Sequence, residues 1–137
     1  MNIQYKAIVT HEENERFFVQ FPTISEAFTE GLNLPEALFN AQEVLNLSLE
    51  GRLEDGVEIP LPDTEKWLKN EYLISPEANI QSVLLIHFNR ENHSLAELAD
   101  ILEIPPQEIE KPKNNMTINC LEKIARVMGK KLMIDFA

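Results

Sequence analysis

The sequence predicts an α+β protein with two parts, and two patterns support this prediction. Up to about residue 75, short segments of alternating apolar residues accompany one long segment with helical periodicity. From residue 76 onward, several short helical segments follow one another with short connections. The second pattern is typical of a helix-turn-helix bundle. We therefore expect a sheet-and-helix domain at residues 1–75 and a small helical domain at residues 76–137.

Four segments of the first part alternate as half-buried strands do. The second of them ends at Pro22, because proline has no N–H to donate to a sheet ladder. The polar segment 11–16 before it predicts a hairpin turn. In the loop before the fourth segment, Asp63 is expected to start one helical turn that carries Trp67 and Leu68. The four expected strands are 3–9, 17–21, 27–29 and 72–74.

A long helix is predicted at residues 33–50 of the first part. Asn33 is its N-cap, and Glu36, three residues later, is the capping-box partner. We expect Gly31 to supply a turn that tolerates a positive φ before this helix, and Gly51 to end the helix. The apolar residues at spacings of three and four form one helix face, and they are Leu34, Leu38, Ala41, Leu45 and Leu49.

Cap residues mark the helices of the second part. Ser94 and Glu97 form a second capping box, Thr117 caps the last helix, and Gly129 ends it. A short helix lies before Pro112, which stops or kinks it. The expected helices are 75–88, 94–102, 106–110 and 117–128, and a final strand is expected at 132–136.

Composition narrows the classes of protein to which the chain belongs. Its 137 residues carry a net charge of −11, with −8 on residues 1–70 and −3 on residues 71–137. Such a field repels nucleic acid and suits a basic protein partner. The single cysteine excludes an intrachain disulfide and fits a reducing compartment. Because the chain shows neither a signal peptide nor a membrane-spanning apolar run, we expect a soluble cytoplasmic protein without a membrane partner.

Several short motifs, in their order and spacing, together resemble the HicB family of antitoxins. The matching segments of the first part are 17–22, 28–31, 36–38, 40–41 and 59–62. Those of the second part are 97–99, 107–109, Thr117 and 129–132, as in the helix-turn-helix version of these antitoxins. The resemblance implies a partial ribonuclease-H-like β-β-β-α-β domain followed by a DNA-binding domain.

The resemblance also implies a function and partners. Proteins of this family bind a small basic mRNA-cleaving toxin (HicA) and block its activity, and they often repress their own operon as dimers or higher oligomers. The acidic first part suits such a toxin, since complementary charge steers encounter. The alternative is an interaction-only relative that has lost its toxin or DNA contacts, or a transcriptional regulator without a toxin partner.

The DNA-binding candidates lie where the second helix of a helix-turn-helix would enter the major groove. A glutamine there reads adenine through paired hydrogen bonds, and lysines, amides and hydroxyls hold the phosphate backbone. These candidate residues are Gln107, Lys111, Lys113, Asn114, Asn115 and Thr117.

Three residues in the same segment oppose DNA binding. Glu108 and Glu110 would repel phosphates, and Pro112 shortens the recognition helix. The sequence therefore leaves both the retention and the loss of DNA affinity open.

No catalytic, metal or cofactor site is expected. Metal-dependent nuclease chemistry needs clustered carboxylates, whereas the expected inward-facing strand residues are apolar. The histidines lack metal-ligand spacing, and His87 on an apolar helix side reads as a core histidine. Cys120 reads as a small buried residue. We therefore expect a protein that is not an enzyme.

The expected final strand also predicts self-association. Leu132, Ile134 and Phe136 alternate along an apolar edge at the end of the chain. An apolar edge of this kind can pair with its copy in another subunit. We therefore expect a homodimer or a higher homo-oligomer.

Overall fold

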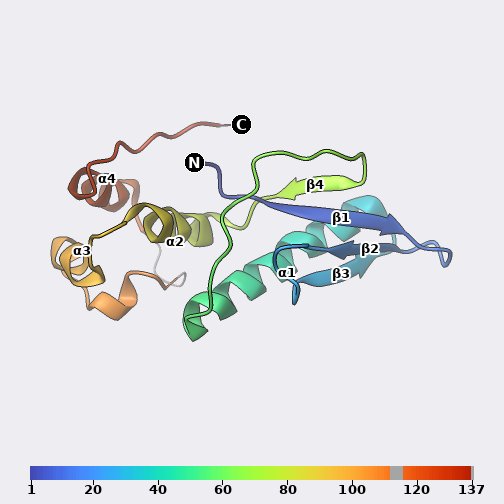
Figure 1. The fold of residues 1–137 in the computed structure, drawn as a ribbon, viewed down its shortest axis with the longest axis horizontal. Coiled ribbons are helices and arrows are strands. Elements are labelled where there is room, and N and C mark those ends of the chain that lie inside the picture. Colours follow the sequence, from blue (N-terminus) through green and yellow to red (C-terminus); the bar gives the residue numbers. More distant parts are fainter. Residues whose placement is uncertain (112–115, 137) are drawn as a thin grey trace. The chain divides into compact units, whose positions relative to one another are not determined.

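The computed structural model describes residues 1–111 and 116–136, and the chain divides into two compact units, Met1–Gln81 and Ser82–Ala137 (Figure 1). The division falls within helix α2 (Ala78–Asn89). Strands lie in the first unit and short helices in the second, so the predicted mixture of strands and helices is confirmed. The domain boundary near residue 75 stays a prediction.

Unit 1 contains a four-stranded antiparallel sheet in the order β3-β2-β1-β4. Its strands are β1 (Tyr5–His11), β2 (Phe17–Gln20), β3 (Phe28–Gly31) and β4 (Glu71–Ile74). Val19 in β2 lies opposite Val9 of β1 and Thr29 of β3. Each of the four predicted strands is confirmed, with ends shifted by one or two residues.

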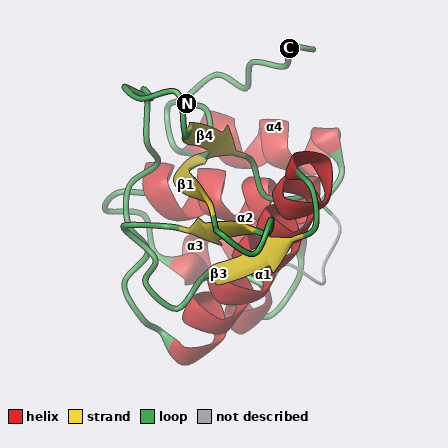
Figure 2. Cartoon of the chain, turned by 90° about the vertical axis from the view of Figure 1, so that its right-hand side faces the viewer, coloured by secondary structure: helices red, strands yellow, loops and turns green. Residues whose placement is uncertain are grey.

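Helix α1 (Leu34–Asp55) packs on one face of this sheet (Figure 2). Because side chains alternate along a strand, Tyr5, Ala7 and Val9 of β1 all point into the core. The helix buries small and branched residues at a spacing of four, and these are Ala37, Ala41, Leu45 and Leu49.

The predicted start of α1 is confirmed. The side chain of Asn33 accepts a hydrogen bond from the Glu36 N–H at 2.9 Å. The Glu36 carboxylate in turn accepts one from the Leu32 N–H at 2.9 Å, one residue before the cap. Two backbone donors at the helix N-terminus are thereby satisfied by side chains.

The predicted end of α1 at Gly51 is wrong. The helix continues to Asp55, and Gly56, with a φ of 67°, is its left-handed C-cap. A glycine inside a helix costs only about 1 kcal/mol relative to alanine. The additional turn places Arg52 beside Glu26, whose carboxylate accepts two hydrogen bonds at 2.7 Å. This ion pair lowers the pKa of Glu26.

Gly31 does not use the positive φ that glycine tolerates. Among the described residues, the glycines with positive φ are Gly56 and Gly129. A β-carbon on Gly31 would lie 2.5 Å from the backbone nitrogen of Ala37. Glycine is required there because β3 and α1 approach each other closely.

The helical turn predicted to start at Asp63 is absent, and residues 61–67 have no regular secondary structure. The Asp63 N–H donates to the Gln4 carbonyl at 2.9 Å, and the Asp63 carboxylate accepts from the Lys6 N–H at 2.8 Å. Asp63 therefore satisfies the backbone of the chain next to β1 instead of capping a helix. Trp67, at the end of this segment, is 76% exposed.

Unit 2 consists of short helices around one apolar cluster. After the part of α2 that it contains come α3 (Leu95–Leu102), the 3₁₀-helix η1 (Pro106–Glu108) and α4 (Ile118–Val127). Ser94 and Thr117 cap α3 and α4 as predicted, by accepting hydrogen bonds from Glu97 and Cys120 N–H groups. The buried members of the cluster are Ile86, Leu98, Ala99, Ile109 and Ile124.

Two predictions for unit 2 are wrong. The expected helix at residues 106–110 is a single 3₁₀ turn of three residues. The expected final strand at 132–136 has no strand structure within the single chain. The hydrogen bonds of this turn are of the 3₁₀ type, since the Ile109 N–H donates to the Pro106 carbonyl at 3.3 Å. Residues 132–136 do not form a strand, because a strand needs a neighbour with which to pair.

Candidate functional site

The predicted DNA-contact residues that the structure describes lie on both sides of residues 112–115. Gln107 is exposed on η1. The Lys111 Nζ atom lies 3.1 Å from Glu108 Oε1, so its charge is partly balanced locally. The Thr117 hydroxyl accepts the Cys120 N–H at 3.2 Å as the cap of α4. Gln107 and Lys111 thus come from one segment, and Thr117 has a structural role of its own.

The remaining predictions in this segment are Lys113, Asn114, Asn115 and Pro112. They lie outside the described residues. The DNA contacts of Lys113, Asn114 and Asn115, and the shortening of the recognition helix by Pro112, stay predictions.

The carboxylate of Glu110 is paired with two side chains and is not fully exposed to solvent. Its Oε1 atom lies 3.1 Å from Nδ1 of His87 on α2 and 3.2 Å from Nε of Arg90, the residue after α2. Burial alone would raise the pKa of Glu110, but the hydrogen bonds and charges of His87 and Arg90 outweigh burial and lower it. The repulsion predicted between Glu110 and phosphates is therefore partly compensated within the unit.

The same contact corrects the prediction for His87. Its side chain is 29% exposed and pairs with Glu110, and its ring packs edge-on against Phe88 at 5.3 Å between centroids. It is a half-buried histidine at the rim of the helix, not a core residue. The apolar periodicity of α2 gave no sign of Glu110, which is distant in sequence.

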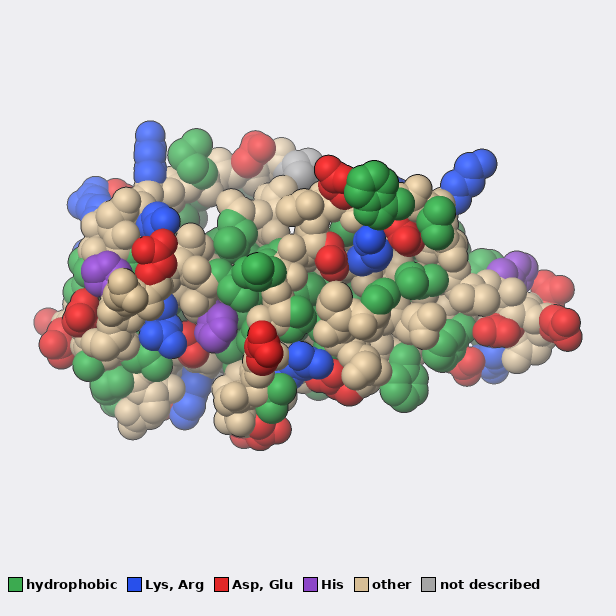
Figure 3. All heavy atoms as spheres, viewed as in Figure 1, with side chains coloured by type: hydrophobic (Ala, Val, Ile, Leu, Met, Phe, Trp, Pro, Cys, Tyr) green, Lys and Arg blue, Asp and Glu red, His purple; other side chains and the backbone are tan. Residues whose placement is uncertain are grey.

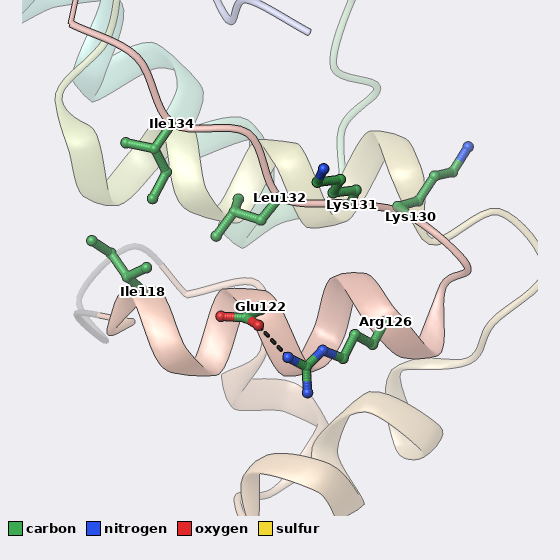
Figure 4. A pocket seen from close by; sticks show the side chains of 7 residues that line it. All are labelled: Ile118, Glu122, Arg126, Lys130, Lys131, Leu132 and Ile134. Carbon is green, nitrogen blue, oxygen red and sulfur yellow. Dashed lines mark hydrogen bonds and ion pairs between the residues drawn. The ribbon is translucent and has the colours of Figure 1, made fainter.

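A groove between α4 and the C-terminal segment is lined by basic and apolar side chains (Figure 4). Arg126 pairs with Glu122 across one turn of α4, and Lys130 lies 3.2 Å from Glu91. The sequence indicated the lysines only as charges that favour a helix C-terminus. The residues lining the groove are Ile118, Glu122, Arg126, Lys130, Lys131, Leu132 and Ile134.

Unit 1 presents a row of acidic and apolar side chains on the outer face of α1. The row starts beside Leu32, just before the helix, and we call its helical part the α1 stripe. Phe39 and Leu47 of this stripe are 63% and 68% exposed, and Leu32 is 63% exposed. The α1 stripe consists of Glu36, Phe39, Glu43, Leu47, Glu50 and Glu54.

A second apolar surface of unit 1 lies on the sheet. The Phe18 and Phe28 rings, on neighbouring strands, have centroids 6.5 Å apart. They line a shallow pocket together with Gln20, Pro22 and nearby residues. The pocket has no ionised side chain among its lining residues, so it lacks the charge of the α1 stripe.

A third feature of unit 1 is the acidic turn between β1 and β2. Figure 3 shows acidic side chains gathered over this turn. Glu12, Glu13 and Glu15 are all exposed there. No large apolar side chain lies among them in the sequence between His11 and Arg16.

Residues 1–111 and 116–136 bring together no group of three or more potential metal-binding side chains. No helix in this part of the chain has the length and apolar character needed to span a bilayer. Cys120 is half-buried, less than predicted.

These features define a small acidic α+β protein with an antiparallel sheet in one unit and short helices in the other. The chain is 34% identical over 136 residues to Antitoxin HicB 2 of Photorhabdus laumondii subsp. laumondii, an alignment that covers 96% of this chain and 94% of that protein. It is 28% identical over 137 residues to Antitoxin HicB of Escherichia coli (strain K12), covering 96% of this chain and 98% of that protein. The chain belongs to the HicB family of antitoxins, and the predicted resemblance is confirmed.

A solved structure is also similar to part of the chain. It is the crystal structure of the N-terminal domain of Burkholderia pseudomallei antitoxin HicB, with a TM-score of 0.47 and 15% identity. The match covers 55% of this chain and 99% of that chain. No protein-family model matches the sequence.

Proposed function

We propose that this chain is a cytoplasmic antitoxin that binds and neutralises a small basic, mRNA-cleaving, HicA-like toxin. The observation that carries the proposal is identity to named HicB antitoxins over nearly the whole chain. The charge of −8 on residues 1–70 supports a basic partner, because opposite charges accelerate encounter and disfavour wrong partners.

The neutralisation we propose is steric, without catalysis by this chain. The strand order β-β-β-α-β of unit 1 is consistent with the partial ribonuclease-H-like fold implied by the family. Tyr5, Ala7 and Val9, which β1 points into the core, provide no carboxylate for a metal ion. Unit 1 would therefore act by covering the RNA-cleaving surface of the toxin.

Co-purification tests this proposal. The chain is expressed together with the small basic protein encoded next to its gene, and only the latter carries a tag. We expect a stable complex that survives moderate salt, since apolar contacts are not screened. Two folded proteins that do not co-purify would contradict the antitoxin function and favour the interaction-only alternative.

Operator binding by unit 2 is a second candidate function. The observation that favours it is the packing of the capped helices α3 and α4 on one apolar cluster, as in a helix-turn-helix bundle. The proposed contacts are Gln107 for a base and Lys111 for a phosphate, with Lys113, Asn114, Asn115 and Thr117 as polar support. Against it stands the length of η1, three residues, which offers little helix to a major groove.

We also propose that the chain forms a homodimer or higher oligomer through residues 132–136. Ile134 and Phe136 are 61% and 99% exposed. Pairing of this segment with its copy would cover apolar side chains and satisfy backbone groups at the same time. A dimer would also present two copies of unit 2 to a palindromic operator.

A further inference from the structure

The geometry of the α1 stripe brings its acidic and apolar side chains onto one narrow surface. Successive members of the stripe are separated by three or four residues. At 100° per residue, all of them fall within an arc of about 80° on the helix. The Leu32 N–H donates to the Glu36 carboxylate at 2.9 Å, which holds Leu32 at the start of the same surface. The surface therefore extends along most of α1.

The carboxylates of this stripe have no cation beside them. Among the described residues, no ion pair joins Glu43, Glu50 or Glu54 to a lysine, arginine or histidine. The basic residue of α1, Arg52, is turned away and binds Glu26 and the Glu58 carbonyl. On an exposed helix face that served only for solubility, lysines between the glutamates would stabilise the helix through ion pairs.

The arrangement is unfavourable for the isolated helix. Glu50 and Glu54 are four residues apart, so their charges repel each other along the surface. Glu54 and Asp55 lie in the last turn of α1, where the helix dipole disfavours negative charge. A partner that brings positive charge to this surface would relieve both effects.

The apolar side chains of the stripe give a partner something to bury. Phe39 and Leu47 lie two turns apart, and each stands between glutamates. Aromatic side chains are enriched in the buried centres of protein interfaces, and polar residues form the rim around them. A surface with this mixture fits a protein that is basic and carries apolar side chains between its cations.

The negative charge of the α1 stripe excludes other binding partners, namely a second copy of the stripe, nucleic acid and anionic lipid. If the stripe met its own copy across a two-fold axis, the glutamate rows would face each other and repel. Nucleic acid and anionic lipid surfaces are repelled for the same reason. The sheet pocket between Phe18 and Phe28 has no charge to attract a basic partner.

We propose that the outer face of α1, from Leu32 to Glu54, is the surface on which the small basic toxin docks. This proposal rests on the proposed antitoxin function and assigns the contact residues within unit 1. Phe39 and Leu47 are the apolar anchors, and Glu43 and Glu50 pair with cations of the toxin.

The test measures binding of purified variants to the tagged basic protein encoded next to the gene, by calorimetry at low and at physiological salt. Phe39→Ala is expected to raise the Kd by about tenfold or more. The double variant Glu43→Lys/Glu50→Lys is expected to raise it at least as much and to reduce its dependence on salt. The new lysine at position 50 would face Glu54, so these changes favour the helix and leave the fold intact.

The matched control reverses the same number of charges elsewhere on unit 1. Glu12→Lys/Glu13→Lys alters the exposed turn between β1 and β2 and should change the Kd by less than about threefold. Light scattering should give each variant alone the mass of the wild-type protein. A change in mass for the α1 variants would assign the stripe to self-association and overturn the proposal.

Two further outcomes separate this proposal from the antitoxin function. If the wild-type chain binds and both α1 variants bind equally well, the docking surface is wrong while the function stands. Loss of binding on Phe28→Ala alone would then place the toxin on the sheet pocket. If the wild-type chain does not bind at all, the antitoxin function fails, and the docking surface fails with it.

Discussion

Gly31 and Ala37 approach each other so closely that a β-carbon on Gly31 would lie 2.5 Å from the Ala37 nitrogen and 2.8 Å from its Cα atom. This contact joins the end of β3 to the first turn of α1. Backbone atoms cannot move aside as a flexible side chain would. The contact therefore fixes where the helix starts on the sheet and, through it, where the α1 stripe lies.

Replacement of Gly31 tests this contact. Gly31→Ala should lower the free energy of unfolding by about 2 kcal/mol, because the new methyl group forces β3 and α1 apart. Urea denaturation measures the effect. The matched control is Gly51→Ala: a β-carbon there meets nothing within 4 Å, and the residue lies inside α1. The control should stabilise the protein by about 1 kcal/mol, and equal midpoints for the two variants would refute the account.

The sequence predicted the elements of unit 1 well, because local rules determine them. Alternation identified β1 and β2, and the Asn33 cap with its Glu36 partner located the start of α1. The end of α1 was missed because two isolated glycines, Gly51 and Gly56, look equivalent in sequence. Arg52 favours the longer helix through an ion pair with Glu26, which lies far away in sequence.

The candidate sites were harder to predict, because they depend on contacts between residues that are far apart in the sequence. Glu110 pairs with His87 and Arg90, which lie far before it in the sequence, so no spacing rule indicates this contact. The α1 stripe, in contrast, is visible as a periodic pattern once the helix is known to reach Asp55. With a helix that ended at Gly51, Glu54 would not belong to the face.

Glu110 should make unit 2 sensitive to acid. Its folded pKa is lowered, so its contribution to stability is complete above the ordinary carboxyl pKa and is lost as the pH falls through the lowered folded value. Glu110→Gln should cost about 1 kcal/mol at neutral pH. In urea melts, the difference from wild type should be constant down to about pH 5 and shrink below it.

The control for this pH dependence is an exposed carboxylate in the same unit. Asp100 on α3 is exposed, so Asp100→Asn should leave the pH profile close to that of the wild type. A Glu110→Gln profile that runs parallel to wild type down to strongly acidic pH would show that the pKa of Glu110 is not lowered.

The C-terminal segment should determine the oligomeric state. Ile134→Glu places a charge on the face shared with Leu132 and Phe136, and we expect monomers by light scattering where the wild type gives dimers or larger species. Met133→Glu changes the opposite side of the extended segment and should retain the wild-type mass. An unchanged mass for Ile134→Glu would contradict pairing through this segment.

Operator binding by unit 2 makes a separate prediction, measured by gel shift on the DNA upstream of the gene. Lys111→Ala should reduce the slope of log K against log salt by about one, because one phosphate contact is lost. Gln107→Ala should relax the sequence preference. Lys69→Ala, an exposed lysine of unit 1, is the control and should leave the slope unchanged. DNA binding that ignores Lys111 and Gln107 would place the contact elsewhere.

Titration shows whether this chain neutralises a small basic RNA-cleaving protein. A fixed amount of the basic protein encoded next to the gene is mixed with RNA, and the purified chain is added in steps. We predict that RNA cleavage falls in proportion to the added chain and stops when the complex is saturated. Undiminished cleavage in the presence of an excess of folded chain would contradict the account.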